Sequence, residues 1–365
     1  MEDLVSPNRA FWRGRSVFLT GHTGFKGSWL TLWLHELGAI VHGYALDPPT
    51  NPALFHVARI EAILSSGRRA NLLDLAELET AISATRPEIV FHLAAQPLVR
   101  QSYLDPVGTL LTNIIGTANV LEATRKVDSV QAVVLVTTDK VYANENAARE
   151  FREADTLGGN DLYSASKAAA EIVAASYRAS FFTGSRGHRA RVATARAGNV
   201  IGGGDWAVDR LIPDCLRSFE GSIPVPLRCP NSVRPWQHVL EPLAGYIRLA
   251  ERLCSDNGGK YATAWNFGPA SSDEATVREV AAAAARIWGD GAKVEHSSGN
   301  EDPPEAHVLR LNSAAARAKL GWKPRWSLER ALQRTVEWHR CWLQGADMDA
   351  VTRSQIRAFE LDGLQ

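Results

Sequence analysis

The chain has 365 residues, of which 45% are hydrophobic and 22% charged, and its 40 basic side chains balance 40 acidic ones. This composition is ordinary for a globular protein of one large or two smaller domains. The sequence has no basic stripe for nucleic acid or an anionic membrane, no bilayer-spanning apolar run and no hydrophobic signal core. We therefore expect a cytoplasmic protein that holds no metal, because its four cysteines lack metal-ligand spacing and suit reduced thiols.

A glycine turn near the N-terminus organises the rest of the chain. Residues 17–19 predict a buried strand, and the apolar stretch from Trp29 to Leu37 predicts a buried helix. Between them glycines recur at every third position: Gly21, Gly24 and Gly27. Strand, glycine turn and helix are the context of a dinucleotide-binding motif, in which free N–H groups at the helix N-terminus face a pyrophosphate. The alternative is a tight turn without a ligand, since many dehydrogenases have Gly-x-Gly-x-x-Gly instead.

Strand and helix patterns then alternate along the chain. Apolar runs predict strands at residues 40–46, 88–95, 131–136 and 191–196, and helices at 75–85, 106–126 and 163–181. This alternation predicts an α/β fold with a Rossmann-like, doubly wound parallel sheet. After residue 197 prolines, tryptophans and arginines become more frequent and the alternation fades. We expect residues 1–196, joined by about 232–256, to form the NAD-binding domain, and residues 197–365 to be mainly a smaller α/β substrate-binding domain.

Polar or small residues follow several predicted strands. Asp47 ends the second strand, where a carboxylate can hold the adenosine ribose and favour NAD over NADP; alternatively it only starts the Asp-Pro-Pro turn. Asn71 occupies a position at which a polar side chain can contact adenine. Ala94 and Ala95 are small enough for a cofactor to pass.

Tyr163 and Lys167 are four residues apart in a predicted helix and therefore share one face. An ammonium close to a phenol favours the ionised phenol and lowers its pKa from about 10. Such a tyrosine suits the removal of a proton from a sugar hydroxyl. An ordinary surface pair is the alternative.

Several sequence motifs together resemble the extended short-chain dehydrogenase/reductases, and within them the nucleotide-sugar 4,6-dehydratases. The resemblance covers essentially the whole chain. It is carried by Phe11-Trp12, the run from Gly21 to Leu30, His92–Arg100, Thr138-Asp139-Lys140, Tyr163-x-x-x-Lys167, Ala197–Trp206 and Arg234–Pro242. It implies a bound NAD that is reduced and reoxidised in each cycle, and CDP-glucose as the expected substrate. The product, a 4-keto-6-deoxy sugar nucleotide, would enter deoxysugar biosynthesis, such as that of lipopolysaccharide O-antigen.

The resemblance also implies roles for individual residues. Tyr163 would accept the proton of the carbon-4 hydroxyl, Lys167 would hold the ribose and lower the pKa of Tyr163, and Thr138 would bind the same hydroxyl. Asp139 would protonate the departing hydroxyl, which requires a raised pKa. The dTDP-glucose enzymes carry Asp-Glu here, so Lys140 would replace glutamate as the carbon-5 base, with its pKa lowered; a structural salt bridge is the alternative for Lys140.

The resemblance also implies which residues form the two binding sites. NAD would contact Gly21, Thr23, Gly24, Phe25, Lys26, Gly27, Asp47, Asn71, Leu72, Leu93, Ala94, Ala95, Asn113, Thr137, Tyr163 and Lys167. The nucleotide sugar would contact Gln96, Asn199, Arg210, Arg234 and His307. Arg210 and Arg234 are expected to hold its diphosphate, although solvated surface arginines remain the alternative. The family commonly forms homodimers through the helices that carry Asn113 and Tyr163.

Two other functions remain open from the sequence. A nucleotide-sugar 4-epimerase would use Tyr163, Lys167 and NAD but would not need the Asp139–Lys140 pair. A non-catalytic nucleotide sensor would keep the sheet, and the presence of the Tyr163–Lys167 pair counts against it.

Overall fold

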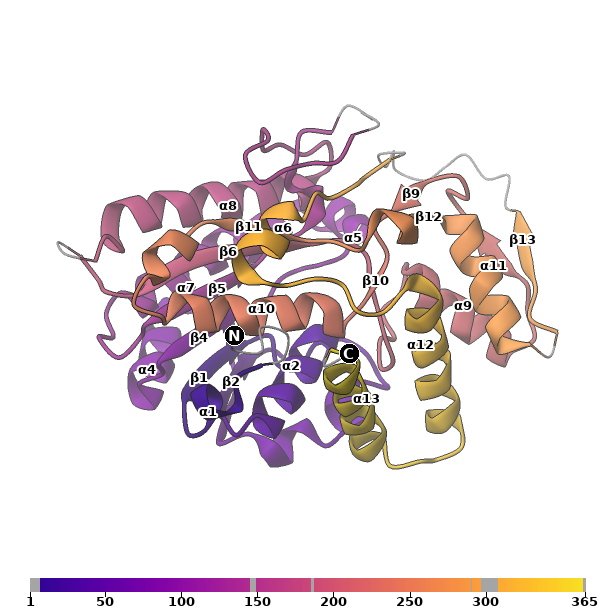
Figure 1. Ribbon diagram of the computed structural model, residues 1–365, viewed down its shortest axis with the longest axis horizontal. Coiled ribbons are helices and arrows are strands. Elements are labelled where there is room, and N and C mark those ends of the chain that lie inside the picture. Colours follow the sequence, from indigo (N-terminus) through magenta and orange to yellow (C-terminus); the bar gives the residue numbers. More distant parts are fainter. Residues whose placement is uncertain (1–6, 145–148, 185–186, 290, 297–307, 364–365) are drawn as a thin grey trace.

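The computed structural model describes residues 7–144, 149–184, 187–289, 291–296 and 308–363. Its centre is a seven-stranded sheet with the order β11-β6-β5-β4-β1-β2-β3, and every neighbouring pair is parallel (Figure 1). The strands are β1 (Ser16–Thr20), β2 (Ile40–Ala45), β3 (Ser66–Arg69), β4 (Ile89–His92), β5 (Ala132–Val136), β6 (Arg191–Ala197) and β11 (Ala264–Phe267). The predicted doubly wound parallel sheet is confirmed. Its strand order reverses between β1 and β4, where such sheets open a ligand crevice at their carboxyl ends.

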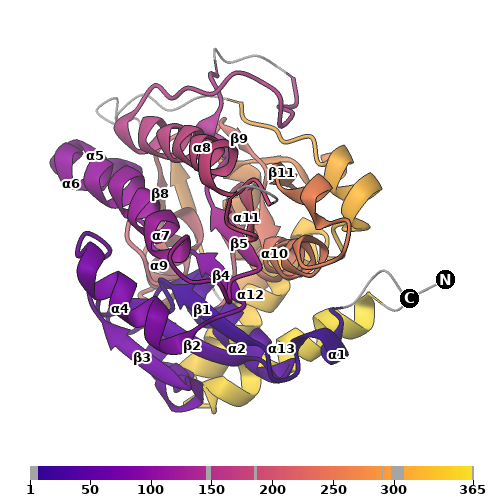
Figure 2. The ribbon, with the colours of Figure 1, turned by 90° about the vertical axis from the view of Figure 1, so that its left-hand side faces the viewer.

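Two helical layers cover the sheet, one on each face (Figure 2). Side chains of a strand alternate between faces, so Val17 and Leu19 point into one core and Phe18 into the other. The first core lies under α2 (Phe25–Glu36) and α10 (Leu240–Leu253). The second lies under α4 (Leu75–Thr85), α7 (Gly116–Thr124) and α8 (Leu162–Phe181). Because both faces are covered, the strands are apolar throughout rather than alternating.

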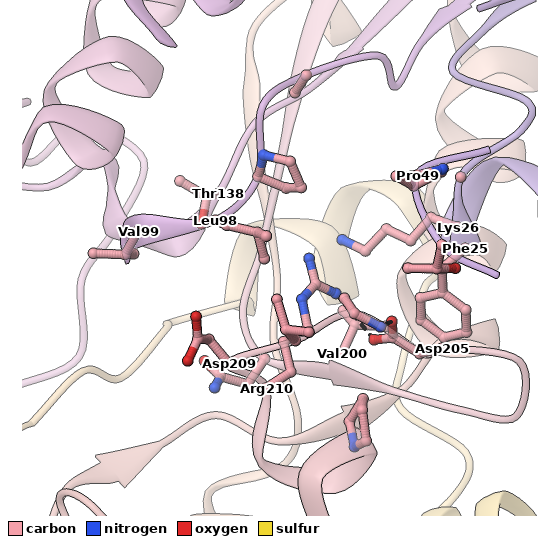
Figure 3. Close-up of a pocket in the computed structure, with 18 of the residues that line it drawn as sticks. Phe25, Lys26, Pro49, Leu98, Val99, Thr138, Val200, Asp205, Asp209 and Arg210 are labelled. Atoms are coloured by element: carbon pink, nitrogen blue, oxygen red, sulfur yellow. Dashed lines mark hydrogen bonds and ion pairs between the residues drawn. The ribbon is translucent and has the colours of Figure 1, made fainter. Parts of the chain in front are cut away.

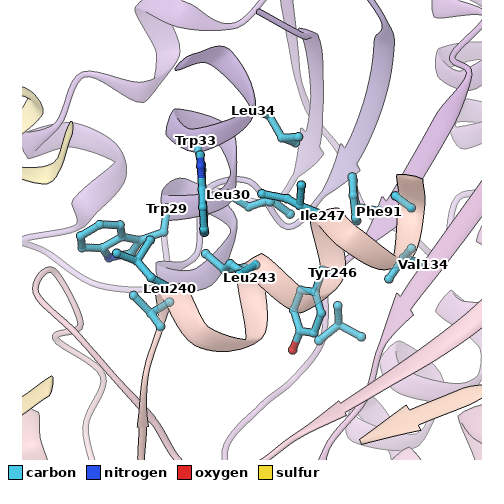
Figure 4. Packing of buried hydrophobic residues seen from close by; sticks show 14 of the residues in the cluster. Trp29, Leu30, Trp33, Leu34, Phe91, Val134, Leu240, Leu243, Tyr246 and Ile247 are labelled. Carbon is cyan, nitrogen blue, oxygen red and sulfur yellow. The ribbon is translucent and has the colours of Figure 1, made fainter. Parts of the chain in front are cut away.

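The helix after the glycine turn is apolar on nearly all sides because it is enclosed. Trp29, Leu30 and Trp33 of α2 pack against Leu243 and Ile247 of α10, and all five side chains are buried (Figure 4). On another side α2 contacts α13 (Met348–Asp362), whose Glu360 accepts a 2.8 Å hydrogen bond from the Trp33 indole. Each large apolar side chain buried in this way contributes about 1.5–3 kcal/mol. The core therefore fixes the position of α2 and of the turn that precedes it.

The remaining elements extend the fold beyond the sheet. The longer helices α9 (Leu211–Glu220), α11 (Val277–Trp288) and α12 (Leu328–Leu343) form a smaller lobe on the right of Figure 1. Strand pairs accompany them: β7 (Val200–Ile201) with β10 (Gln237–His238), β8 (Val225–Leu227) with β13 (Val294–His296), and β9 (Val233–Arg234) with β12 (Ala275–Thr276). The short helices are α1 (Arg9–Trp12), α3 (Leu54–Val57), α5 (Val99–Leu104) and α6 (Pro106–Leu110). The 3-10 turns are Ile60–Ile63, Asp139–Val141, Gly258–Tyr261 and Ser271–Asp273, and the π-helical turns are Leu111–Ile115 and Ala316–Leu320. Two elements from the second half of the chain belong to the central sheet layer and its cover: β11 is an edge strand of the sheet, and α10 packs on one of its faces.

Some predicted elements differ from the structure. The strand expected over 88–95 ends at His92, so residues 93–95 form a loop, and the helix expected over 106–126 is divided by the π-helical turn 111–115. The edge strand β3 was not predicted because all four of its residues are exposed and none is a large apolar one. Within the described part of the chain, no helix has both the length and the apolar content required to cross a bilayer.

Candidate active site

The glycine turn places the N-terminus of α2 at the crevice of the sheet. Gly21 has φ of +79°, and a Cβ atom there would lie 2.6 Å from the backbone nitrogen of Ala94. A Cβ at Gly27 would lie 2.0 Å from the carbonyl oxygen of Gly21, so only glycine lets the helix start this close to the strand. Gly24 is the N-cap of α2 and has no side chain with which to cap the helix. The first N–H groups of α2 are therefore available to an anion.

A cavity of about 720 Å³ opens above this turn. It extends along the carboxyl ends of the strands to the smaller lobe (Figure 3). Nearly all residues expected to bind the cofactor line it: Gly21, Thr23, Gly24, Phe25, Lys26, Gly27, Asp47, Asn71, Leu72, Leu93, Ala94, Ala95, Thr137, Tyr163 and Lys167. Thr138, Asp139, Lys140, Asn199, Arg210 and Arg234 line it as well. Residues from distant parts of the sequence are thus brought together in one enclosed site.

The turn after β5 carries the expected acid and base. Thr138 donates a 2.9 Å hydrogen bond to Oδ1 of Asp139, and its hydroxyl acts to lower the pKa of Tyr163. Burial raises the pKa of Asp139, against the opposing effects of the Lys140 charge and the Thr138 hydroxyl. Among the described residues, buried Oδ2 of Asp139 has no hydrogen-bond partner. A carboxyl group in this state favours the protonated form that a general acid requires.

The tyrosine and lysine of α8 are both buried at the cavity. Lys167 was expected to lower the pKa of Tyr163, but burial dominates and raises that pKa to about 12. Burial also lowers the pKa of Lys167 to about 8, while Glu171 acts in the opposite direction. The Lys167 ammonium donates a 3.2 Å hydrogen bond to the carbonyl of Val136. In the protein alone, therefore, the phenol is a weak acid, and ionising it requires a further positive charge in the site.

Asp47 lies at the rim of the cavity and its side chain is 89% exposed. Its Oδ1 is 3.4 Å from Nε of Arg69. The Arg69 guanidinium is itself held in place, because Nη1 lies 2.9 Å from Nε2 of His22 and the group stacks over the Phe55 ring. The carboxylate is therefore oriented by an arginine and still faces solvent, where a ribose can reach it.

Cationic side chains converge from opposite walls of the cavity. Lys26 extends from the start of α2, and Arg210, paired with Asp205 at 3.1 Å, extends from the segment before α9 (Figure 3). Burial and the charge of Arg210 lower the pKa of Lys26 to about 7. Arg234 is buried at the same cavity, and its charge opposes the raised pKa of Asp139. This arrangement offers positive charge to the phosphates of two ligands.

Two of the predicted binding residues, Gln96 and Asn113, do not line the cavity. Gln96 donates through its amide to the Leu98 carbonyl at 3.0 Å and to Thr109 at 2.9 Å. Asn113 bonds the Gln96 backbone and, at 2.8 Å, the hydroxyl of Ser166. Neither side chain lines the cavity: Gln96 joins the loop after β4 to α6, and Asn113 joins it to α8. His307 lies outside the described residues.

Other cavity residues were not predicted as ligand contacts. Arg100 and Arg228 both line the cavity and both pair with Asp209, at 3.0 and 2.8 Å. Arg100 belongs to the segment that follows β4. Because segments that follow parallel strands gather at one edge of the sheet, this position could have identified Arg100 as a candidate ligand contact. Among the described residues, no cluster of histidine, cysteine and carboxylate side chains suits a metal ion.

The parallel sheet, the glycine turn and the buried Tyr163–Lys167 pair define an extended short-chain dehydrogenase/reductase. The family model for GDP-mannose 4,6 dehydratase matches residues 18–335. The CDP-glucose 4,6-dehydratase of Salmonella typhimurium is 49% identical over 351 residues, which are 96% of this chain and 97% of that protein. The dTDP-glucose 4,6-dehydratase of Streptomyces griseus is 29% identical over 69% of this chain and 73% of its own. This chain belongs to the nucleotide-sugar 4,6-dehydratase family.

Solved structures resemble the chain at the level of the fold. A dTDP-glucose 4,6-dehydratase from Streptomyces venezuelae, solved with NAD bound, has a TM-score of 0.76 and 23% identity over 89% of this chain and 97% of its own. The UDP-glucose 4-epimerase of Thermotoga maritima has a TM-score of 0.77 and 23% identity over 90% of this chain and 99% of its own. Because dehydratases and an epimerase share the fold equally well, the fold alone does not distinguish the two reactions.

Proposed function

We propose that this protein is an NAD-dependent CDP-glucose 4,6-dehydratase, which forms CDP-4-keto-6-deoxy-glucose and water. The observation that carries the proposal is the meeting of Thr138, Asp139, Lys140, Tyr163 and Lys167 in one cavity beside the glycine turn. The 49% identity to the Salmonella enzyme supports CDP-glucose as the substrate. A 4-epimerase needs the tyrosine and lysine but has no use for a paired acid and base on the adjoining turn.

The cavity has the features that NAD requires. The N-terminus of α2 can receive the diphosphate, since neither Gly24 nor Gly27 has a side chain that would cover its first N–H groups. Asp47 would hold the adenosine ribose, and Lys167 the ribose next to the nicotinamide. Bound NAD would supply the hydride acceptor at sugar carbon 4 and, later in the same cycle, the hydride donor at carbon 6.

In the first step Tyr163 removes the proton of the carbon-4 hydroxyl, and Thr138, whose hydroxyl acts on the pKa of Tyr163, binds the same hydroxyl. The raised pKa of Tyr163 makes the phenolate strongly basic once formed. The positive charges of Lys167 and of an oxidised nicotinamide favour that phenolate when the cofactor is bound.

The resulting ketone makes the carbon-5 proton acidic, and Lys140 removes it. Asp139, whose pKa is raised by burial, gives its proton to the carbon-6 hydroxyl, which leaves as water. Reduction at carbon 6 and return of a proton to carbon 5 complete the reaction, so that the only net loss from the substrate is water. Lys140 is then restored, whereas Tyr163 holds one proton more and Asp139 one fewer than at the start, and exchange of one proton with solvent at each of the two restores them for the next cycle.

The proposal is tested by incubating the purified protein with NAD and, separately, CDP-glucose, dTDP-glucose, UDP-glucose and GDP-mannose. We expect a 4-keto product, recognised by the ultraviolet absorbance that base induces in it, and the fastest formation from CDP-glucose. Conversion of CDP-glucose to CDP-galactose, or binding without any product, would contradict the proposal.

We further propose that the protein pairs with a second copy through the helices that carry Asn113 and Tyr163, namely α6 with the π-helical turn Leu111–Ile115 that continues it, and α8. These elements lie in contact, and they carry exposed apolar side chains: Val107 of α6 is 64% exposed, Ile172 of α8 is 59% exposed, and Leu111 and Ile115 of the π-helical turn are also exposed, as is Leu104 at the end of the neighbouring α5. Apolar side chains gathered on adjacent helices are typical of an interface, and an isologous pairing would bury this surface against itself.

A further inference from the structure

Glu171 continues the face of α8 that carries the tyrosine and lysine. Tyr163, Lys167 and Glu171 follow one another at intervals of four residues, and all three are buried. Tyr163 and Lys167 reach the cavity, whereas Glu171 lies one turn further along the helix and is not among the cavity residues. The function proposed above assigns no role to this carboxylate.

Glu171 binds the residue that follows β5 and two residues of β6. Its Oε1 accepts a 2.5 Å hydrogen bond from the hydroxyl of Thr137, and its Oε2 accepts one of 2.6 Å from Thr194 of β6. Oε2 also pairs with Arg196 of β6 at 2.8 Å, and the two charged side chains are only 3% and 4% exposed. Thr137 is the residue directly before Thr138, so Glu171 holds the start of the acid–base turn.

Arg196 holds the other end of the same turn. Its Nη1 donates a 2.9 Å hydrogen bond to the hydroxyl of Tyr142 and one of 3.1 Å to the carbonyl of Glu153. The guanidinium also lies over the Tyr142 ring, 5.1 Å from its centre. Tyr142 directly follows the turn Asp139–Val141. Both residues that flank the segment 138–141 are therefore bonded to one buried ion pair.

Stability alone is a weak reason for such an ion pair. Removing two charges from water is costly, and apolar replacements of buried ion pairs are often neutral or stabilising. The pair does, however, fix three elements in a single arrangement: α8 with Tyr163 and Lys167, the turn after β5, and β6. A displacement of about 1 Å between reacting groups is enough to slow catalysis a hundredfold.

We propose that the Glu171–Arg196 ion pair positions the Asp139–Lys140 turn against Tyr163 and Lys167, so that oxidation at carbon 4 and elimination of water occur on one sugar in one orientation. This inference depends on the proposed dehydratase function. Glu171 and Arg196 are positioning residues and touch neither substrate nor cofactor. Glu171 also favours the charged form of Lys167, since its carboxylate opposes the effect of burial on that pKa.

The test compares Glu171→Gln with the double variant Glu171→Gln/Arg196→Gln. The single variant leaves the Arg196 charge buried without its partner, which is strongly destabilising. The double variant removes both charges and keeps hydrogen-bonding groups at both positions, so we expect its thermal stability to be higher than that of the single variant. Thr194→Val is a milder variant, because it deletes only one hydrogen bond to Glu171. It tests the positioning of the turn while Glu171 and Arg196 both keep their charges.

We expect the double variant to keep the parent KM for CDP-glucose and to lose about 10- to 100-fold in kcat. Because the turn is displaced relative to α8, elimination should slow more than oxidation, and reduced nicotinamide should accumulate on the enzyme after substrate is added. Thr194→Val should show the same changes to a smaller degree. A merely structural pair would lower stability without this accumulation.

The matched control is Glu36→Gln, which breaks the ion pair of Glu36 with Arg353 between α2 and α13, at 2.5 Å and away from the cavity. We expect it to lower stability and leave kcat unchanged. Parent kcat and no accumulated reduced cofactor in both the double variant and Thr194→Val would overturn the proposal while the dehydratase function stands. A parent protein that forms no 4-keto sugar would overturn both.

Discussion

The glycine turn permits a sharp test of where the cofactor diphosphate binds, because its glycines differ in what surrounds them. A Cβ atom at Gly27 would lie 2.0 Å from the carbonyl oxygen of Gly21, a backbone contact that cannot move away. At Gly24 the nearest atom would be 3.5 Å away, and its φ of −79° and ψ of 169° suit alanine. Gly259 has no atom within 4 Å of such a Cβ.

These distances predict opposite effects on folding and binding. Gly27→Ala should destabilise the protein without cofactor by about 1–3 kcal/mol, the usual cost of overpacking a rigid contact. Gly24→Ala should keep the free energy of unfolding within about 1 kcal/mol. If the diphosphate lies against the start of α2, however, the new methyl group of Gly24→Ala should weaken NAD binding at least about tenfold, or about 1.4 kcal/mol.

The assay is chemical denaturation of the cofactor-free protein together with titration calorimetry of NAD binding. Gly259→Ala, in the turn Gly258–Tyr261, serves as the control and should change neither quantity. Parent-like NAD affinity in Gly24→Ala would refute the placement of the diphosphate at this helix. Parent-like stability in Gly27→Ala would refute the packing argument.

Four further predictions concern catalysis, pH and assembly. Tyr163→Phe should slow oxidation at carbon 4 by about a hundredfold or more in stopped-flow measurements, the scale of a lost general base; an unchanged rate would exclude Tyr163 as that base. Lys140→Ala should still oxidise carbon 4 but block elimination, so reduced cofactor should accumulate, and normal turnover would exclude Lys140 as the carbon-5 base. Burial lowers the pKa of His92 to about 3. Between about pH 6.5 and pH 3, His92 therefore binds a proton in the unfolded chain but not in the folded protein. When the pH is lowered from 7 to 5, the free energy of unfolding, measured by denaturation, should therefore fall by about 2 kcal/mol more in the parent than in His92→Gln. An equal fall in both proteins would contradict a buried neutral ring. The double variant Val107→Glu/Ile172→Glu should be monomeric by light scattering if α6 and α8 form the interface, whereas an unchanged mass would exclude that face.

The sequence predicted best where a local signal and a buried face agreed. The helix predicted over 75–85 has these bounds in α4, because Asp74 caps its first turn and apolar side chains recur on its inner face. The edge strand β3, Ser66–Arg69, carries no such signal, since all of its residues are exposed. In the same way nothing local marks the π-helical turn 111–115 within an apolar helical pattern.

The sequence predicted those residues of the candidate site that directly follow a strand. Asp47, Thr137–Lys140 and Asn199 follow strands of the central sheet or its continuation, and parallel strands bring such positions to one edge. The direction of the Tyr163 pKa was predicted wrongly because the sequence shows a neighbouring lysine but not the degree of burial. Glu171 resembles any helical glutamate until Thr194 and Arg196 are seen to face it.

The most direct test of the dehydratase mechanism follows one hydrogen atom. CDP-glucose carrying deuterium at carbon 4 should give a 4-keto-6-deoxy product with that deuterium at carbon 6, because the same bound cofactor takes it up and returns it. Mass spectrometry and NMR locate the label. Deuterium found at carbon 4 of an epimerised sugar, or lost to the solvent, would contradict the account.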